Sequence, residues 1–330
     1  MPVSPAIAGL LCALLVACSG SSATAQPATQ PWPTTKPITI VVPVPPGPAV
    51  DFVARLVAEK LRQSLGQTVV VENRGGASGA IASAMVARAA PDGYTLIAAT
   101  SGTHVSPVHL MKNLAYDPIK DFTPIMAAAE PVTGLVVNAG LPVKSVPELI
   151  AYAKANPGKL TYGSSGVGSV FHVMGELLNR TAGIETRHVP YRGVALAMQD
   201  VIAGHIPMMF ISVSSAAGAL QDGKARLLAV LEAKRYSKLP QVPSMSEIVP
   251  AFRKPPTWFG FFGPANMPPE LVARLNAEMV KAITAPDARA KLEAADLTVI
   301  GGTPDQFAKL LREGIEGFGE IVKAAGITPQ

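Results

Sequence analysis

The chain has 330 residues, of which 48% are hydrophobic and 15% charged, so it is not a disordered chain and is long enough for two domains. Lys and Arg number 28 against 23 Asp and Glu, but they are scattered singly, which argues against a nucleic-acid-binding surface and suits an acidic small molecule. The 29 Gly and 31 Pro, with only 5% aromatic residues, indicate many turns between short elements and argue against a helical bundle.

The N-terminal segment is typical of an export signal. No charged side chain precedes Lys36, and Ala6–Ala17 is an apolar run about as long as a signal-peptide core and too short to span a membrane. Cleavage after Ala23-Thr24-Ala25 would make residues 1–25 a signal peptide. Alternatively, Leu15-Val16-Ala17-Cys18 matches a lipobox, in which case the signal ends at residue 17 and Cys18 carries a lipid. Residues 26–37 are predicted to form an extended tether.

Both cysteines, Cys12 and Cys18, lie in this segment. The predicted mature chain therefore has no disulfide, no cysteine-ligated metal and no cysteine nucleophile. No later apolar run is long enough to predict a membrane span.

From Ile38 the chain alternates short β-branched runs with longer helical patterns, and most strands are followed by a turn rich in Gly, Ser or Pro, which is typical of an α/β fold. The first unit is predicted to be a parallel, right-handed β-α-β-α-β run. Its strands are expected at 38–44, 68–72 and 95–99, and its helices from about 50 to 65 and from 78 to 89.

A second α/β unit follows the apolar run that ends at Asn138. Its helices are expected at 146–155, 169–182, 194–203 and 216–222, and its strands at 160–163, 186–189, 206–210 and 225–231. A strand at 258–262 precedes helices at 269–283, 286–294 and 304–325, with a strand at 297–300. Two such units predict two lobes joined by a two-segment hinge, with lobe 1 formed by 38–138 plus 262–330 and lobe 2 by 139–261. A ligand is then expected between the lobes.

Five turns that follow predicted strands contain small or polar residues. Because a helix N-terminus leaves N–H groups unpaired and carries partial positive charge, glycine turns at such positions favour an anion. Each turn also has a purely structural interpretation: Asp51 and Ser169 are suited to capping helices, Arg74 to pairing within its own lobe, and Tyr191 to the core. The five turns are 45–51, 73–79, 100–104, 164–169 and 190–193.

Catalytic and cofactor templates do not match. Gly163-Ser164-Ser165-Gly166 lacks the G-x-S-x-G spacing, and no histidine partner for a catalytic serine can be identified from the sequence. The chain has no P-loop, and the Gly166-Val167-Gly168 run lacks the third glycine of a dinucleotide fingerprint. The sequence therefore predicts neither an enzyme nor a metal or cofactor, since no H-x-x-x-H spacing links its histidines 104, 109, 172, 188 and 205.

A longer set of ordered strings resembles the solute receptors of tripartite tricarboxylate transporters, also called Bug receptors. The resemblance runs from about Trp32 to Ala325, nearly the whole predicted mature chain. The strings are KPITIVVP (36–43), VENRGGASG (71–79), APDGYTL (90–96), YDP (116–118), DFTP (121–124), ANPGKLTYG (155–163), VPYRG (189–193) and LPQVPS (239–244).

The resemblance implies a two-lobed α/β periplasmic binding protein of the type II-like, Venus-flytrap kind, with a central, mainly parallel sheet in each lobe. It also implies a receptor that captures a small organic acid without a cofactor and presents the acid to membrane subunits of a transporter. From the residues themselves, the scattered charges argue against nucleic acid, and a monomer is expected because the sequence shows no long apolar surface repeat. The residues carried over as ligand-binding are Gly47, Ala49, Asp51, Ser78, Gly79, Thr100, Ser101, His104, Ser164, Ser165, Gly168, Ser169 and Tyr191.

Two positions depart from the family pattern. Pro48 follows Gly47 where relatives have a second glycine, and proline removes an N–H donor. Ile211 and Ser212 stand where many relatives carry a polar or acidic residue, which argues for a dicarboxylate, an aromatic acid or a similar ligand over an amino acid. Two other functions stay open: a ligand-sensing accessory of a signalling system, and an exported hydrolase that uses the same cleft.

Overall fold

The computed structural model describes residues 32–34, 36–324 and 326–329. The predicted cleavage sites, Cys18 and most of the predicted tether lie outside the described residues. The chain divides into two units, Met1–Thr35 and Lys36–Gln330, and the second contains all the helices and strands given below. Within the described ranges, none of the helices combines the length and the apolar character needed to cross a membrane.

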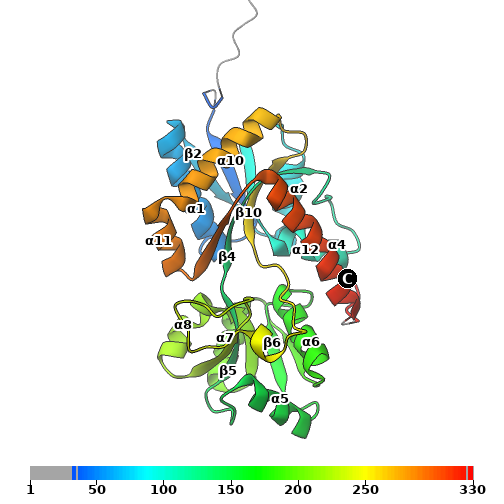
Figure 1. Ribbon diagram of the computed structural model, residues 1–330. Coiled ribbons are helices and arrows are strands. Elements are labelled where there is room, and N and C mark those ends of the chain that lie inside the picture. Colours follow the sequence, from blue (N-terminus) through cyan, green and yellow to red (C-terminus); the bar gives the residue numbers. More distant parts are fainter. Residues whose placement is uncertain (1–31, 35, 325, 330) are drawn as a thin grey trace, which may run out of the picture. The chain divides into compact units, whose positions relative to one another are not determined.

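A six-stranded sheet in the order β11-β4-β10-β3-β1-β2, together with its helices, forms what we call the first lobe. Figure 1 shows α1, α10 and α11 on one side of this sheet and α2 and α12 on the other. The strands are β1 (Ile38–Val42), β2 (Val69–Asn73), β3 (Thr95–Thr100), β4 (Phe122–Pro131), β10 (Phe259–Pro264) and β11 (Leu297–Gly301). The helices are α1 (Ala49–Leu65), η1 (Ala77–Gly79), α2 (Ala80–Ala87), α3 (Ser101–His104), α4 (Ser106–Leu110), α10 (Pro269–Thr284), α11 (Pro286–Ala294) and α12 (Pro304–Ala324).

A five-stranded sheet in the order β7-β6-β8-β5-β9, with its own helices, forms the second lobe. Its strands are β5 (Thr133–Asn138), β6 (Thr161–Ser164), β7 (Arg187–Pro190), β8 (Met208–Ser212) and β9 (Ala225–Val230). Its helices are α5 (Val146–Ala155), α6 (Val170–Ala182), α7 (Val194–Ala203), α8 (Val213–Gln221) and α9 (Met245–Ile248).

The α/β, two-lobed fold expected from the sequence is confirmed, and each sheet is mixed, with most of its strands running in one direction. β1, β2 and β3 are parallel as predicted, and so are β6, β7 and β8. However, β10 is antiparallel to β3 and β4, and β5 is antiparallel to β8 and β9. The reason is that β5 and β10 are the strands by which the chain enters each lobe from the other, so they run against their neighbours.

The chain changes sheets at Val132 and again ahead of Phe259. β4 ends at Pro131 and β5 begins at Thr133, so a nearly continuous extended segment serves both sheets. The strand that ends at Asn138 therefore belongs to the five-stranded sheet, although the predicted lobe limit assigned it to the first lobe. β10 joins the six-stranded sheet from Phe259 onward, ahead of the predicted limit at 262.

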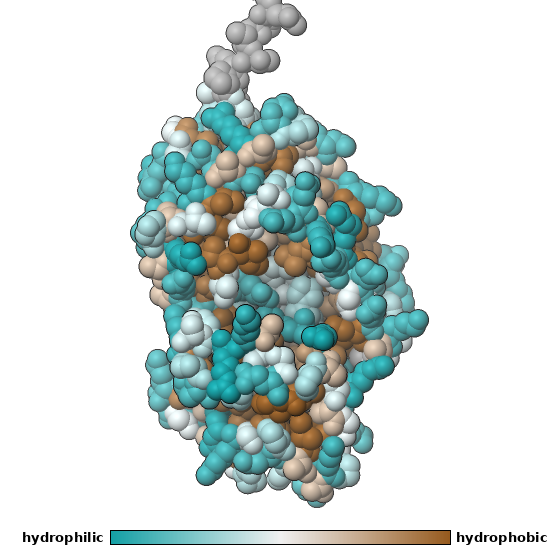
Figure 2. All heavy atoms as spheres, viewed as in Figure 1, coloured by the Kyte–Doolittle hydropathy of each residue, from teal (hydrophilic) through white to brown (hydrophobic). Residues whose placement is uncertain are grey.

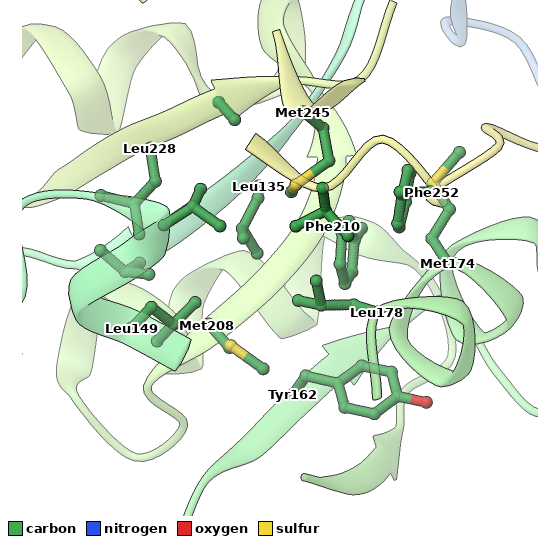
Figure 3. Close-up of a cluster of buried hydrophobic side chains, with 14 of the residues drawn as sticks. Leu135, Leu149, Tyr162, Met174, Leu178, Met208, Phe210, Leu228, Met245 and Phe252 are labelled. Atoms are coloured by element: carbon green, nitrogen blue, oxygen red, sulfur yellow. The ribbon is translucent and has the colours of Figure 1, made fainter. Parts of the chain in front are cut away.

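Strand alternation builds a core on each face of the second sheet. Met208 and Phe210 of β8 lie in a cluster with α5, α6 and α9 (Figure 3), while Met209 and Ile211 lie in the cluster with α7 and α8. In the first lobe, Trp258, Phe262 and Phe307 are among the buried aromatic residues of the core. On the face seen in Figure 2, apolar residues form separate patches among polar and charged ones.

Candidate functional site

Strand register brings the predicted loops to one end of each sheet. In the first sheet, Val42 of β1 pairs with Asn73 of β2, and Thr100 of β3 pairs with Phe259, where β10 enters. In the second sheet, Ser164 of β6 pairs with Pro190 of β7. The strand-end loops therefore lie beside one another within each lobe, on the side where ligands bind in open α/β sheets.

Asp51, in the first turn of α1, ties together the first two loops. Its Oδ2 accepts hydrogen bonds from the Gly47 N–H and from Arg55 Nε, each at 3.0 Å. Its Oδ1 accepts one from Asn73 Nδ2 at 2.9 Å, and Asn73 also donates to the carbonyl of Val44. Burial raises the pKa of Asp51, but the hydrogen bonds from Arg55, Asn73 and Gly47 outweigh it and leave the pKa below its ordinary value. The Asp51 carboxylate therefore holds the first two loops in position.

We expect Asp51→Asn to weaken ligand binding about tenfold, because an amide offers one acceptor oxygen and turns an NH2 group toward a donor. Isothermal titration with a ligand found in the screen described below would measure the change. Glu59→Gln, on the same helix and paired with Arg62 at the surface, is the matched control and should leave affinity unchanged. An Asp51→Asn variant with wild-type affinity would contradict the positioning role.

The second loop contains four consecutive residues with positive φ. The angles are 126° at Gly76, 46° at Ala77, 54° at Ser78 and 88° at Gly79. Left-handed conformations at Ala77 and Ser78 cost about 1–2 kcal/mol each, and such strained residues cluster at ligand-binding sites. Ser78 is exposed and Gly79 is buried, so the loop places the serine at the surface.

The third loop is anchored on its neighbours. The Thr103 hydroxyl accepts a hydrogen bond from the Thr100 N–H at 3.1 Å, and the Ser101 N–H donates to the carbonyl of Trp258. A Cβ on Gly79 would lie 2.6 Å from the Thr103 methyl and 3.0 Å from Pro43 Cβ. Three chain segments, after β1, after β2 and after β3, therefore meet at Gly79.

His104 occupies a core position, which corrects the expectation that its side chain contacts a ligand. It is 0% exposed, and its ring lies 4.5 Å from that of Phe122 and 4.6 Å from that of Phe262. Burial lowers the pKa of His104 to about 3, so the imidazole is neutral. The sequence placed it at a strand end but could not show that α3 turns it inward.

In the second lobe, Ser164 is buried and hydrogen-bonded within its own loop. Its Oγ accepts from the Gly166 N–H at 3.1 Å and lies 2.6 Å from His188 Nε2. The sequence alone did not identify this histidine as a partner of Ser164. Ser169 caps α6 by accepting from the His172 N–H, and the Gly168 N–H donates to His172 Nδ1 at 3.0 Å.

Tyr191 uses its hydroxyl within the second lobe. The hydroxyl donates to Asp200 Oδ2 at 2.6 Å, and burial together with this carboxylate raises the pKa of Tyr191 to about 12. Its N–H is also engaged, since it donates to the carbonyl of Ser164. Ser165, in the neighbouring Ser164–Ser169 loop, is half-buried.

One contact joins the loops of the two lobes. A Cβ on Gly168 would lie 2.9 Å from Leu110 Cδ1, and Leu110 ends α4, the helix that follows the Thr100–His104 loop. The structure thus brings the second-lobe loop against the first lobe. Residues that the sequence analysis did not single out are Arg55, Asn73, Thr103, His172 and His188, which position the loops through hydrogen bonds. Asn73 and Thr103 lie inside turns that the sequence did indicate, whereas Arg55, His172 and His188 lie outside them.

Two surface cavities lie away from these loops. One of about 260 Å³ is lined by residues of α1 and α10, including Lys60 and Lys281. The other, of about 470 Å³, lies between α6 and α12 and includes Arg180 and Glu320. In the part of the chain that the structure describes, no three His, Cys, Asp or Glu side chains gather in a way that could hold a metal ion.

Comparison with known proteins gives one consistent result. The family described as "Tripartite tricarboxylate transporter family receptor" matches residues 53–327. Protein BugT of Bordetella pertussis is 31% identical over 315 residues, which cover 95% of each chain. An R. palustris protein solved with adipate has a TM-score of 0.82 and 35% identity, covering 91% of this chain and 100% of its own. MatC of Rhodopseudomonas palustris, solved with malate, has a TM-score of 0.76 and 34% identity, covering 87% and 99%.

Proposed function

Because the chain belongs to the tripartite tricarboxylate transporter receptor family, we propose that it captures a small dicarboxylate between the strand-end loops of its two lobes and presents it to the membrane subunits of such a transporter. Membership confirms the resemblance found in the sequence and makes the chain a periplasmic solute-binding receptor of the Bug type. Delivery to the periplasm by a cleaved signal, or anchoring through Cys18, is part of the proposal.

The observation that carries the proposal is that strand register places the predicted loops at one end of each sheet. Backbone N–H groups and small hydroxyls, with Ser78 at the surface and Ser165 half-buried, suit a carboxylate without a paired cation. The relatives solved with adipate and with malate agree with a dicarboxylate ligand.

The second-lobe surface lacks an acidic partner for a ligand ammonium at the expected position. Ile211 is 1% exposed, and the Ser212 hydroxyl lies 2.7 Å from that of Ser215. Asp51, the acid among the predicted ligand-binding residues, is already engaged by three donors. These features favour an acid without an amino group over an amino acid.

The contact between Ser164 and His188 raises the alternative of a hydrolase, and burial argues against it. Ser164 is 0% exposed, so its Oγ is not presented to a substrate. His188 stacks on His172 with ring centroids 3.9 Å apart, whereas a catalytic base is usually oriented by a carboxylate. The geometry of Ser164 and His188 therefore fits a role in holding the loop in place better than the roles of nucleophile and base.

A thermal-shift screen tests the proposal. The purified mature protein would be heated with mono-, di- and tricarboxylates, amino acids and aromatic acids. A ligand at a hundredfold excess over its Kd stabilises by about 2.7 kcal/mol, which raises the Tm of a protein of this size by several degrees. We expect adipate, malate or a related dicarboxylate to raise the Tm and the corresponding diamide to leave it unchanged. No shift with any acid, from protein shown by mass spectrometry to carry no ligand, would contradict carboxylate capture.

A further inference from the structure

The stacked imidazole rings of His172 and His188 contact the Ser164–Ser169 loop. The rings of His172 on α6 and His188 on β7 are 3.9 Å apart and nearly parallel, with 21° between their planes. Each contacts a different part of the loop. His172 Nδ1 accepts the Gly168 N–H at 3.0 Å, and His188 Nε2 lies 2.6 Å from the Ser164 hydroxyl.

The hydrogen bond to His172 fixes the protonation state of that ring. Because Nδ1 accepts the Gly168 N–H, it carries no proton, and the neutral ring has its proton on Nε2. Protonating Nδ1 would set two N–H groups against each other and remove the acceptor of Gly168. Gly168 has a φ of 75° and lies against Leu110 of the first lobe, so a change at this residue reaches the contact between the lobes.

The surroundings favour the neutral stack at neutral pH. Burial lowers the pKa of His172, although Glu176 on the same helix, with Oε1 4.0 Å from His172 Nε2, opposes this effect. Burial and the neighbouring His172 lower the pKa of His188 to about 4. Tyr162 on β6 donates to Glu176 Oε1 at 2.6 Å, and Arg180 of α6 and Glu320 of α12 line the cavity beside Glu176. Two protonated rings 3.9 Å apart would repel each other.

We infer that His172 and His188 are positioning residues whose neutral stack holds the Ser164–Ser169 loop in its ligand-binding form, and whose protonation releases the loop and with it a bound carboxylate. This inference rests on the proposed function. Each histidine favours the folded loop above pH 6.5, and its contribution is lost progressively as the pH falls from there toward the lowered value. The receptor therefore binds more tightly at neutral pH than in mild acid.

The first test needs no ligand. The amide signal of Gly168 in wild-type protein would be followed by NMR from pH 8 to pH 5, together with the ring signals of both histidines. We expect the Gly168 signal to titrate together with the His172 ring, with a midpoint below 6.5. A Gly168 signal that stays constant while the His172 ring titrates, or that moves with neither ring, would overturn the inference.

The second test measures affinity for adipate and malate at pH 7.5 and pH 5.5. His172→Asn keeps an acceptor oxygen near the Nδ1 position but cannot be protonated there, and His188→Gln does the same near Nε2. Protonation of the ligand itself is common to all proteins compared and cancels in their ratio. We expect the wild type to lose at least fivefold more affinity on acidification than His172→Asn, with near wild-type binding by that variant at pH 7.5.

His205→Asn is the matched control, since His205 is exposed with a side-chain fraction of 71% and lies outside the stack. It should keep the wild-type pH profile. Equal profiles for the wild type and His172→Asn would overturn the inference. If no acid of the thermal-shift screen binds at any pH, the proposed function fails, while the Gly168 titration still decides whether the stack controls the loop.

Discussion

Replacing Lys254 with methionine is expected to lower the free energy of unfolding by about 3 kcal/mol, because it leaves two partly buried carboxylates without their shared cation. Lys254 Nζ lies 2.7 Å from Glu130 Oε1 and 2.7 Å from Glu232 Oε1, and its side chain is 11% exposed. Glu130 lies near the end of β4, Glu232 follows β9, and Lys254 lies in the segment that leads back to β10. The ion cluster thus joins the segments by which the chain passes between its lobes.

Further hydrogen bonds hold the carboxylates of Glu130 and Glu232 in place, so these side chains cannot easily rotate toward solvent. Glu130 accepts a hydrogen bond from the Thr257 hydroxyl at 2.8 Å, and Glu232 accepts from the Thr133 N–H at 3.0 Å. Glu232 Oε2 is buried, and no hydrogen bond to it is found among the described residues. Because the glutamate side chains keep 33% and 20% exposure, the expected loss lies at the lower end of the range for buried ion pairs.

Urea unfolding of the wild type and Lys254→Met measures this effect. Lys234→Met removes an exposed lysine of the neighbouring segment and is the control, with an expected change within about 0.5 kcal/mol. Adding Glu130→Gln and Glu232→Gln to Lys254→Met should restore much of the loss, since the unpaired charges are then gone. A loss for Lys254→Met no larger than that of the control would show that the cluster does not stabilise the fold.

Gly79→Ala is expected to reduce affinity for a dicarboxylate at least a hundredfold and to lower the free energy of unfolding by about 3 kcal/mol, by overpacking and by backbone strain together. Gly79 has a φ of 88°, and the added Cβ would lie 2.6 Å from the Thr103 methyl. Thr103 cannot move aside freely, because its hydroxyl accepts from the Thr100 N–H and its carbonyl accepts from the Tyr116 hydroxyl. All three first-lobe loops therefore shift together.

Gly66→Ala separates strain from overpacking. Gly66 ends α1 with a φ of 64°, and a Cβ there would meet nothing within 4 Å. Its cost should be the left-handed backbone alone, about 1 kcal/mol, with unchanged affinity. Titration calorimetry and urea unfolding on both variants make the comparison. An affinity of Gly79→Ala within threefold of that of Gly66→Ala would contradict the convergence of loops at Gly79.

Most elements could be predicted from the sequence because their signals are local. α5, α7 and α11 begin and end where the sequence placed them, since Pro or Gly residues mark both ends of α5 and α7 and the start of α11. β4 was missed: its sequence, FTPIMAAAEP, contains two prolines and three consecutive alanines, which are poor strand formers. Its strand conformation comes from pairing with β10 and β11 on either side, and such pairing leaves no trace in a single segment.

By itself, the sequence determined the α/β class, the two lobes, the positions of the loops at strand ends, and the family, because these depend on residue periodicity, turn chemistry and ordered strings. Only the tertiary structure decided which loop residues are buried or hydrogen-bonded within the protein. Asp51, His104 and Ser164 are engaged or buried through partners 22, 18 and 24 positions away, namely Asn73, Phe122 and His188. The cluster of Lys254 with Glu130 and Glu232 is likewise formed by chain folding. Such contacts form only when distant segments pack together, so no local sequence pattern predicts them.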